Sequence, residues 1–287
     1  MNQAIKLAFN VFKLRIGIVI AITALAGYAI TPGHVPAWQI AVLVLAVLLS
    51  SASAGAFNQY YEFDLDRQMA RTRKRPFATG ALAHHRGWLA LILALTAVAV
   101  AAAWYAANPW AALYTFLGAF FYAVVYTVWL KRRTWWNIVI GGLAGSFAVL
   151  AGAASVSPAL SPEALILALV LFLWTPSHFW SLAIAFRKDY EQAGVPMLPV
   201  VKGDAFAAKA ILANTVLLVA ASLAPVLFQP GWIYFIFAAA GGAYFLNYNL
   251  RLVANPNRDS AMACFHASLL QLSLLLAGAM LDAAVRG

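Results

Sequence analysis

The stretch AWQIAVLVLAVLLSSASAGAFNQYY, residues 37–61, decides the class of fold, because it contains no Asp, Glu, Lys or Arg. An apolar helix of about 20 residues is long enough to cross the hydrocarbon core of a lipid bilayer. Over the whole chain, hydrophobic residues make up 64% and charged residues only 10%, whereas soluble domains average roughly 45–50% and 25%. The sequence therefore predicts an integral membrane protein.

Apolar runs of this kind recur along the chain, and each is expected to be a transmembrane helix, because lipid offers no hydrogen-bond partner to an exposed backbone. The nine predicted spans are 16–31, 37–61, 87–107, 110–130, 136–155, 161–186, 205–228, 231–253 and 261–285. We expect an all-α, polytopic membrane protein of nine transmembrane helices, with a single domain over residues 1–287. The loop layout suggests two parallel four-helix repeats, 14–135 and 136–258, plus one helix, with a site at the repeat interface.

Positive charge is distributed unequally between the two sides of the predicted membrane. Of the 19 Lys and Arg residues, all but Arg286 lie near the N-terminus or the connections on one side. Basic connections stay in the cytoplasm, so we expect a cytoplasmic N-terminus and an external C-terminus in the cell (inner) membrane. Topology and contact with lipid headgroups explain the net charge of +10, which is therefore no signal for nucleic acid.

Acidic residues are concentrated in two long connections on the predicted cytoplasmic side, 62–86 and 187–204. If the helix of residues 37–61 continues, Asn58, Glu62 and Asp66 form one stripe of oxygen atoms about 80° wide and about 12 Å long. Asp64 falls off this stripe, as a surface or capping residue. Hard oxygen ligands beside water suit Mg²⁺, which takes one or two carboxylates and completes its shell with water and phosphate. Asp189, in the second connection, is a further candidate ligand.

Cationic side chains close to these acids are candidates for binding a diphosphate, because guanidinium groups bind phosphate oxygens in pairs. The candidates are Arg71, Arg75, Lys131 and Lys188. The alternative is a basic loop that serves only topology and anionic lipid, and this is the favoured interpretation for Arg73 and Lys74. Arg71 and Arg75 would be one turn apart if the helix persists, and Pro76 is expected to end it.

His178 precedes Asp189 by almost three helical turns, so on a continuous helix it would lie on nearly the same face, about 16 Å deeper. Two interpretations remain open for this histidine. It could meet the reacting part of a long substrate, or it could be hydrogen-bonded between helices near Pro176 as part of the packing.

These residues resemble the intramembrane prenyltransferase superfamily, whose first motif, N-x-x-x-D/E-x-x-x-D, matches Asn58, Glu62 and Asp66. Further segments resemble one branch, the protoheme IX farnesyltransferases or heme O synthases. They are M-x-R-T-x-x-R-P from Met69 to Pro76, YTxxLKRxTxxNIxxGG from Tyr126 to Gly142, and HFWxLA followed by DYxxAGxPMLP from His178 to Pro199. Leu14 stands where the family often has proline, and the second loop keeps only Asp189 where other prenyltransferases have an acid-rich repeat, as in the heme branch.

The resemblance implies an enzyme that uses Mg²⁺ to transfer a farnesyl group from farnesyl diphosphate to a vinyl group of protoheme IX, giving heme O and diphosphate. It implies that Mg²⁺ and diphosphate are held by Asn58, Glu62, Asp66 and Asp189, and the diphosphate also by Arg71, Arg75, Lys131 and Lys188. It places on the heme side His178, Arg132, Asn137 and Tyr190. The implied partners are both substrates, membrane lipid and a downstream heme-modifying enzyme, and the implied site faces the cytoplasm.

Two other functions are compatible with the sequence. One is a prenyltransferase that acts on a quinone or phenolic acceptor, and the other is a secondary transporter of an anionic substrate. A transporter would carry ionisable residues deep in several spans, whereas the carboxylates here gather at one membrane face. The sequence therefore favours a prenyltransferase.

Overall fold

The computed structural model describes residues 3–228 and 231–286, and this part of the chain is helical with no β-strand. Its elements are α1 (Gln3–Val11), α2 (Leu14–Ala29), α3 (Ala37–Tyr61), α4 (Phe63–Gln68), α5 (Pro76–Thr79), α6 (Gly87–Ala106), α7 (Pro109–Phe120), the π-helix η1 (Phe121–Leu130), α8 (Asn137–Gly141), α9 (Leu143–Val156), α10 (Pro162–Ala185), α11 (Arg187–Gln192), α12 (Leu198–Lys202), α13 (Asp204–Leu223), the 3₁₀-helix η2 (Ala224–Leu227), α14 (Trp232–Ala254) and α15 (Arg258–Arg286). The predicted all-α class is confirmed.

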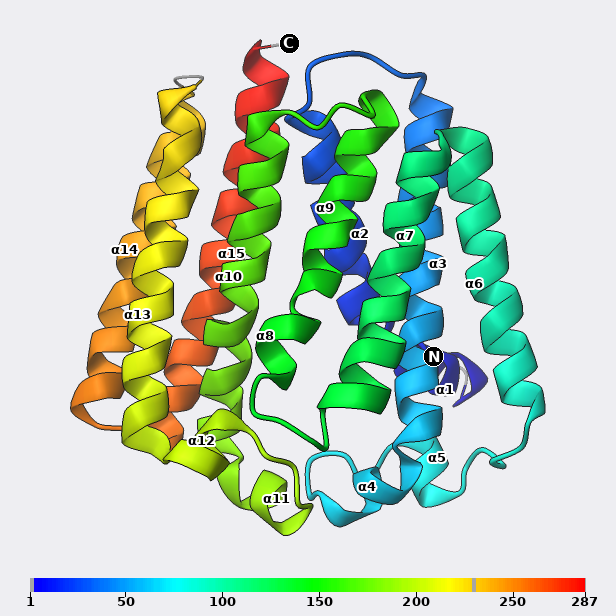
Figure 1. Cartoon of the computed structure of the whole chain (residues 1–287), viewed down its shortest axis with the longest axis vertical. Helices are drawn as coiled ribbons and strands as arrows, with labels where there is room; N and C mark the ends of the chain where they lie inside the picture. Colours follow the sequence, from blue (N-terminus) through cyan, green and yellow to red (C-terminus); the bar gives the residue numbers. More distant parts are fainter. Residues whose placement is uncertain (1–2, 229–230, 287) are drawn as a thin grey trace.

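The long helices run alongside one another as one bundle, with α4, α5, α11 and α12 at one end and the C-terminus at the other (Figure 1). Within the described residues, seven helices are long and apolar enough to cross a membrane, or eight if the bent pair of α1 and α2 counts as one span. The chain is thus a multi-pass membrane protein. Helix occupies all nine predicted spans, but the count of nine is not confirmed.

The difference between the nine predicted spans and the eight that qualify lies at α14. This helix packs beside α13 and α15 but is not among the described helices that qualify as spans. Its polar residues Asn247, Asn249 and Arg251 lower the hydropathy of an otherwise apolar segment. Asn249 is fully buried, and its Oδ1 accepts a hydrogen bond from Thr215 of α13 at 3.2 Å. Hydrogen bonds of this kind hold helices together where water is absent.

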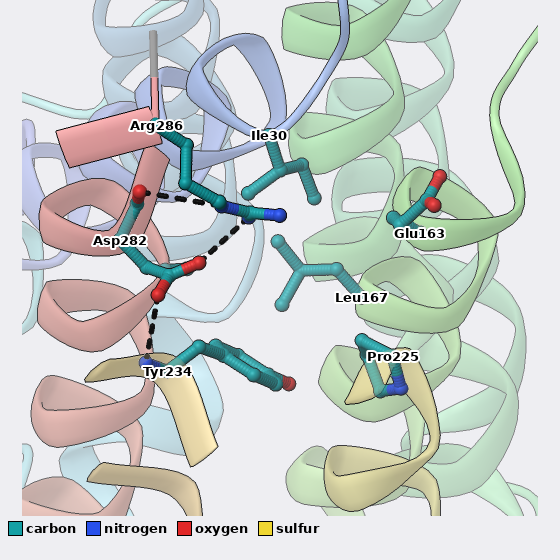
Figure 2. A pocket seen from close by; sticks show the side chains of 8 residues that line it. Ile30, Glu163, Leu167, Pro225, Tyr234, Asp282 and Arg286 are labelled. Atoms are coloured by element: carbon teal, nitrogen blue, oxygen red, sulfur yellow. Dashed lines mark hydrogen bonds and ion pairs between the residues drawn. The ribbon is translucent and has the colours of Figure 1, made fainter. Parts of the chain in front are cut away.

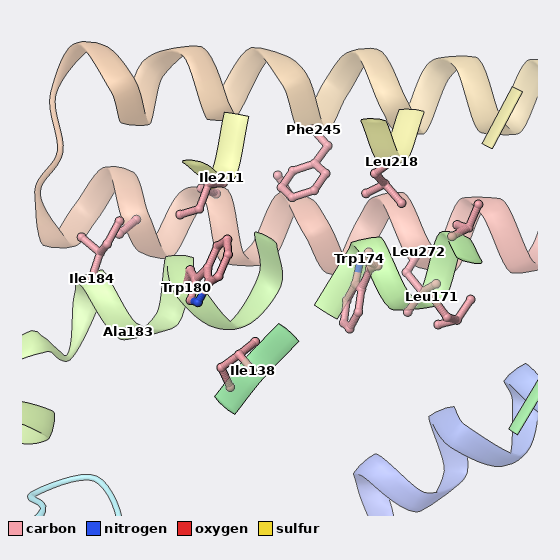
Figure 3. Close-up of a cluster of buried hydrophobic side chains, with 14 of the residues drawn as sticks. Ile138, Leu171, Trp174, Trp180, Ala183, Ile184, Ile211, Leu218, Phe245 and Leu272 are labelled. Carbon is pink, nitrogen blue, oxygen red and sulfur yellow. The ribbon is translucent and has the colours of Figure 1, made fainter. Parts of the chain in front are cut away.

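The second half of the bundle packs around α10, whose apolar side chains point to its neighbours in several directions (Figure 3). Trp174 and Trp180 of α10 belong to the same buried cluster as Ile211 and Leu218 of α13 and Phe245 of α14. Their burial, with that of Leu272 of α15, fixes α10 against α13 and α15. Helix α10 leads directly into the second acidic connection.

An unusually close approach joins α2, in the first predicted repeat, to α9, in the second. A Cβ atom added at Gly27 would meet the carbonyl group of Val149, and one added at Gly152 would meet the carbonyl group of Ala24. Glycine lets two helix backbones approach closely in a membrane. This contact fixes α2, and with it the α1–α2 bend that reaches the candidate site.

Candidate functional site

Asn58, Glu62 and Asp66 form the predicted stripe, although the helix is interrupted within it. Glu62 separates α3 from α4 with φ −98° and ψ 15°. The hydrogen bonds between residues four apart nevertheless persist, since Glu62 N donates to Asn58 O at 3.0 Å and Asp66 N to Glu62 O at 2.8 Å. All three side chains are buried, whereas Asp64 lies off the stripe and is exposed.

Each carboxylate of the stripe is paired with a cation from another segment. Lys131 Nζ lies 2.5 Å from Glu62 Oε2, and Arg75 Nη1 donates to both oxygens of Asp66 at 2.8 and 2.9 Å. Asn58 Nδ2 donates to Glu62 Oε2 at 2.9 Å. Glu62 Oε1 is buried and has no hydrogen-bond partner among the residues that the structure describes. The ion pairs compensate the cost of burying two carboxylates at a membrane boundary, where an unpaired charge is costly.

Lys13 is a site residue that the sequence analysis did not single out. Its Nζ donates to Asn58 Oδ1 at 2.6 Å and to the hydroxyl group of Tyr122 at 3.0 Å. Among the described residues it is the only non-glycine residue with positive φ, at 47°, and it lies at the 58° bend between α1 and α2. In the sequence, a lysine before the first apolar run looks like a topological charge. Only the bend brings its side chain to Asn58.

The second acidic connection meets the first, as predicted for a site shared by both. Phe186 breaks the helix between α10 and α11, with φ −117° and ψ 30°. Asp189 Oδ2 accepts a hydrogen bond from the backbone N–H of Arg71 at 3.2 Å, and Arg71 Nη2 donates to the hydroxyl group of Tyr190 at 3.1 Å. Lys188 is exposed and forms no hydrogen bond or ion pair with the described residues.

The expectation that a helix persists to Pro76 is wrong. The helix α4 ends at Gln68, and Met69 is extended, with φ −104° and ψ 126°. Arg71 and Arg75 therefore lie in a turn-rich loop and are not one helical turn apart. Pro76 does not end a helix but begins α5 at its first position, where the missing proline N–H costs no hydrogen bond.

His178 is a residue of α10 whose side chain contacts α15 and is only 6% exposed. Its Nδ1 is 2.7 Å from Ser268 Oγ, and its ring stacks on Trp174 and Phe265 with centroid distances of 4.1 and 4.4 Å. This is the interhelical packing arrangement left open above. The break at Phe186 also interrupts the continuous helix that would align His178 with Asp189. A role toward heme stays a prediction.

Arg132 and Asn137, two other candidates for the heme side, are engaged with the protein. Arg132 donates to both carboxylate oxygens of Asp64, at 2.9 and 3.1 Å. The Arg132 guanidinium holds the pKa of the Asp64 carboxyl below its usual value, and Asp64 raises the pKa of Arg132. Asn137 is buried and donates to Thr134 O at 2.6 Å, while its own Oδ1 has no partner.

The oxygen donors of the site suit a hard divalent cation, although no group of three His, Cys, Asp or Glu side chains in the described chain is arranged around one point as metal ligands. Glu62, Asp66 and Asp189 supply carboxylate oxygens, and Glu62 Oε1 has no other partner. Asn58 is the least suitable of the four predicted ligands, because its single side-chain oxygen already accepts a hydrogen bond from the Lys13 ammonium group. The chemistry of the donor set fits Mg²⁺.

A separate cavity lies at the opposite end of the bundle, between the ends of α2, α10, α14 and α15 (Figure 2). Its volume is about 30 Å³. Asp282 accepts a hydrogen bond from the backbone N–H of Tyr234 at 3.4 Å, and Arg286 Nη2 lies 2.7 Å from Asp282 Oδ2. None of the residues that line this cavity belongs to the acidic connections, so we do not assign the chemistry to it.

Comparison with known proteins identifies the family. The UbiA prenyltransferase family matches residues 20–275. The chain belongs to this family. It is 57% identical over 288 residues to protoheme IX farnesyltransferase 2 of Paramagnetospirillum magneticum, with 100% of both chains covered. It is 41% identical to protoheme IX farnesyltransferase 1 of Cenarchaeum symbiosum, over 96% of this chain and 95% of that one.

UbiA proteins of known structure share the fold. A UbiA homologue from Aeropyrum pernix K1 superposes with a TM-score of 0.77 at 23% identity, over 94% of this chain and 98% of that one. A homologue from Archaeoglobus fulgidus, solved with DMAPP and Mg²⁺, gives a TM-score of 0.75 at 18% identity, over 97% of this chain and 99% of that one. The comparisons support a prenyltransferase over a secondary transporter.

Proposed function

We propose that this UbiA prenyltransferase transfers the farnesyl group of farnesyl diphosphate to a vinyl carbon of protoheme IX, giving heme O and diphosphate. The observation that carries the proposal is the 57% identity, over the whole length of both chains, to a relative named protoheme IX farnesyltransferase. The convergence of buried acids and cations at the ends of α3 and α10 supports it, because a diphosphate leaving group needs both a metal and counter-charges.

In the proposed mechanism, Glu62, Asp66 and Asp189 would hold Mg²⁺. The ion would neutralise charge on the leaving diphosphate as the allylic C–O bond breaks. Arg75 and Lys131 exchange their carboxylate partners for diphosphate oxygens when the substrate binds. Lys188 and Lys13 provide further positive charge around the leaving group. Preorganised charge of this kind is usually the largest contribution to catalysis.

The tyrosines of η1 are placed to protect the allylic cation. Tyr122 and Tyr126 stack with their ring centroids 5.8 Å apart, and Lys13 and Lys131 lie 5.5 and 5.8 Å from those centroids. A ring that faces one cation can also stabilise an allylic cation formed beside it. Enclosure by these rings would keep water from the cation until the vinyl carbon attacks. Water then adds to the carbocation left on the vinyl-derived carbon and loses a proton to solvent, which completes the hydroxyethylfarnesyl side chain.

The proposed site faces the cytoplasm, where the basic connections are expected. It lies at the end of the bundle that carries α4, α5, α11 and α12 (Figure 1). Farnesyl diphosphate would then enter with its charged group at the membrane surface and its chain in the apolar interior. We also propose membrane lipid as a partner, and a downstream heme-modifying enzyme as the recipient of the product.

Diphosphate release with different acceptors tests the proposed function. Purified protein is given farnesyl diphosphate and Mg²⁺ with protoheme IX, with 4-hydroxybenzoate, or with no acceptor. We expect diphosphate release only in the sample with protoheme IX, with one diphosphate released for each heme that is modified. Diphosphate release only with the phenol would indicate a phenolic acceptor. Diphosphate release that leaves protoheme IX unmodified would contradict the proposal.

A further inference from the structure

Two arginines from distant parts of the chain share one aromatic ring beside the candidate site. The Cζ atoms of Arg71 and Arg258 each lie 5.8 Å from the ring centroid of Phe186. The two Cζ atoms are therefore no farther apart than twice that distance. Phe186 itself lies at the break between α10 and α11. The ring thus joins the loop after α4, the start of α11 and the start of α15.

Neither guanidinium group forms an ion pair within the described part of the chain. Arg71 donates to the neutral hydroxyl group of Tyr190, and the contact with Phe186 is the only interaction of the Arg258 side chain there. Four other cations of this end are matched with acids, in the pairs Arg75–Asp66, Lys131–Glu62, Arg132–Asp64 and Arg187–Asp204. Arg71 and Arg258 instead lie against one ring without an ion pair among the described residues, and like charges at this range repel each other.

Helix stability does not explain the position of Arg258. It is the first residue of the long helix α15, where the positive end of the helix dipole disfavours a cation. Arg71, in contrast, is held in place, because its backbone N–H donates to Asp189 and its guanidinium contacts the buried Tyr190. An anionic ligand would compensate both arginines at once.

We propose that Arg71, Phe186 and Arg258 bind the carboxylate groups of the acceptor. The inference rests on the proposed function, which supplies a flat acceptor with two propionate groups. A guanidinium group binds a carboxylate through two parallel hydrogen bonds, and the Phe186 ring offers an apolar contact for the macrocycle beside them. Lys131 is less suitable for this role because the proposed mechanism assigns it to the diphosphate, and Arg132 is less suitable because it already holds the carboxylate of Asp64.

Esterification of the acceptor gives a specific test. Arg258→Gln is compared with wild type on protoheme IX and on its dimethyl ester, which has the same ring without the negative charges. The matched control is Arg251→Gln, an exposed arginine of α14 that stacks on Tyr248 alone at 5.0 Å. Loss of one hydrogen bond between charged groups typically lowers affinity by about 10-fold or more. We therefore expect Arg258→Gln to lower kcat/KM for protoheme IX by about 10-fold or more, with no effect on the ester.

Arg251→Gln should leave both acceptors unaffected, and the activity of Arg258→Gln on the ester shows that the variant is folded. Equal loss on acid and ester, or no loss on either, would overturn the inference. The affinity for each acceptor is measured from the change in its Soret absorbance, in the absence of farnesyl diphosphate. This measurement tests the binding site independently of the transfer reaction. If wild type binds protoheme IX through Arg258 but transfers no farnesyl group to it, the inference stands and the proposed function fails.

Discussion

At the scale of single residues, the site depends on cations that reach buried acids from distant segments. Glu62 and Asp66 would be costly at a membrane boundary without Lys131 and Arg75. Lys13 adds a third cation, which occupies the oxygen of Asn58 and so orients its amide group toward Glu62. Substrate binding must therefore exchange partners within a charged network that is already assembled.

Lys13→Gly separates the charge of Lys13 from its backbone bend. Glycine adopts positive φ without strain, so the α1–α2 bend should persist while the ammonium group is lost. We expect an unchanged or higher melting temperature and a KM for farnesyl diphosphate raised by about 10-fold, the scale of one charged hydrogen bond. Steady-state kinetics and thermal unfolding in detergent measure both quantities. Lys13→Arg, which keeps a cation, should restore part of the affinity, whereas wild-type kinetics for Lys13→Gly would remove Lys13 from the site.

The acids of the site were predictable from sequence, but their partners were not. Asn58, Glu62 and Asp66 follow a fixed four-residue spacing, which a linear sequence reveals directly. The pairing of Glu62 with Lys131, and of Asn58 with Lys13, spans 69 and 45 residues. Such contacts depend on how helices pack, and no local pattern encodes them.

At the scale of helices, the apolar spans were predictable because lipid imposes helix on any long apolar run. The points at which these helices are interrupted were not predictable. Glu62 and Phe186 end α3 and α10 next to the site, and η1 is a π-helix whose wider turn lets Thr127 Oγ1 donate to Tyr122 O at 2.8 Å. Irregular turns of this kind often occur at functional sites. They follow from tertiary contacts rather than from hydropathy.

The contact between α2 and α9 gives a prediction about stability. Gly152→Ala places a methyl group against the backbone of Ala24, so the helices must separate, and we expect destabilisation of roughly 3 kcal/mol or more. The control is Gly145→Ala in the same helix, where an added Cβ has no neighbour within 4 Å. Melting temperatures in detergent should fall for the first variant and stay or rise for the second. Equal melting temperatures would contradict the close approach of α2 and α9.

At the scale of the whole molecule, both acidic connections lie at one end of the bundle and the C-terminus at the other (Figure 1). The division into repeats 14–135 and 136–258 stays a prediction. In both halves, however, a long helix, α3 or α10, leads into short helices that carry the acids, α4 or α11. A substrate bound between these segments would contact both halves of the chain.

The orientation of the bundle can be tested with fused reporters. The basic connections should face the cytoplasm, so a reporter after residue 80 or 202 should give a cytoplasmic signal. Reporters at residues 33 and 158, at the other end, should give an external signal and serve as controls in the same host. An external signal at residue 80 would place the acidic connections on the wrong side for a cytoplasmic supply of diphosphate.

The central claim is that the acids at the ends of α3 and α10 support farnesyl transfer to protoheme IX, and the mass of the heme product tests it most directly. Purified protein is incubated with Mg²⁺, farnesyl diphosphate and ferrous protoheme IX. Asp66→Asn is compared with Asp64→Asn, a control that changes an exposed acid off the stripe. The ion pair between Asp64 and Arg132 contributes little to stability because it is exposed. Wild type and Asp64→Asn should yield a heme heavier by one farnesyl and one hydroxyl group, while Asp66→Asn should lose activity by about 100-fold or more. Heme of unchanged mass from wild type, or full activity of Asp66→Asn, would contradict the account.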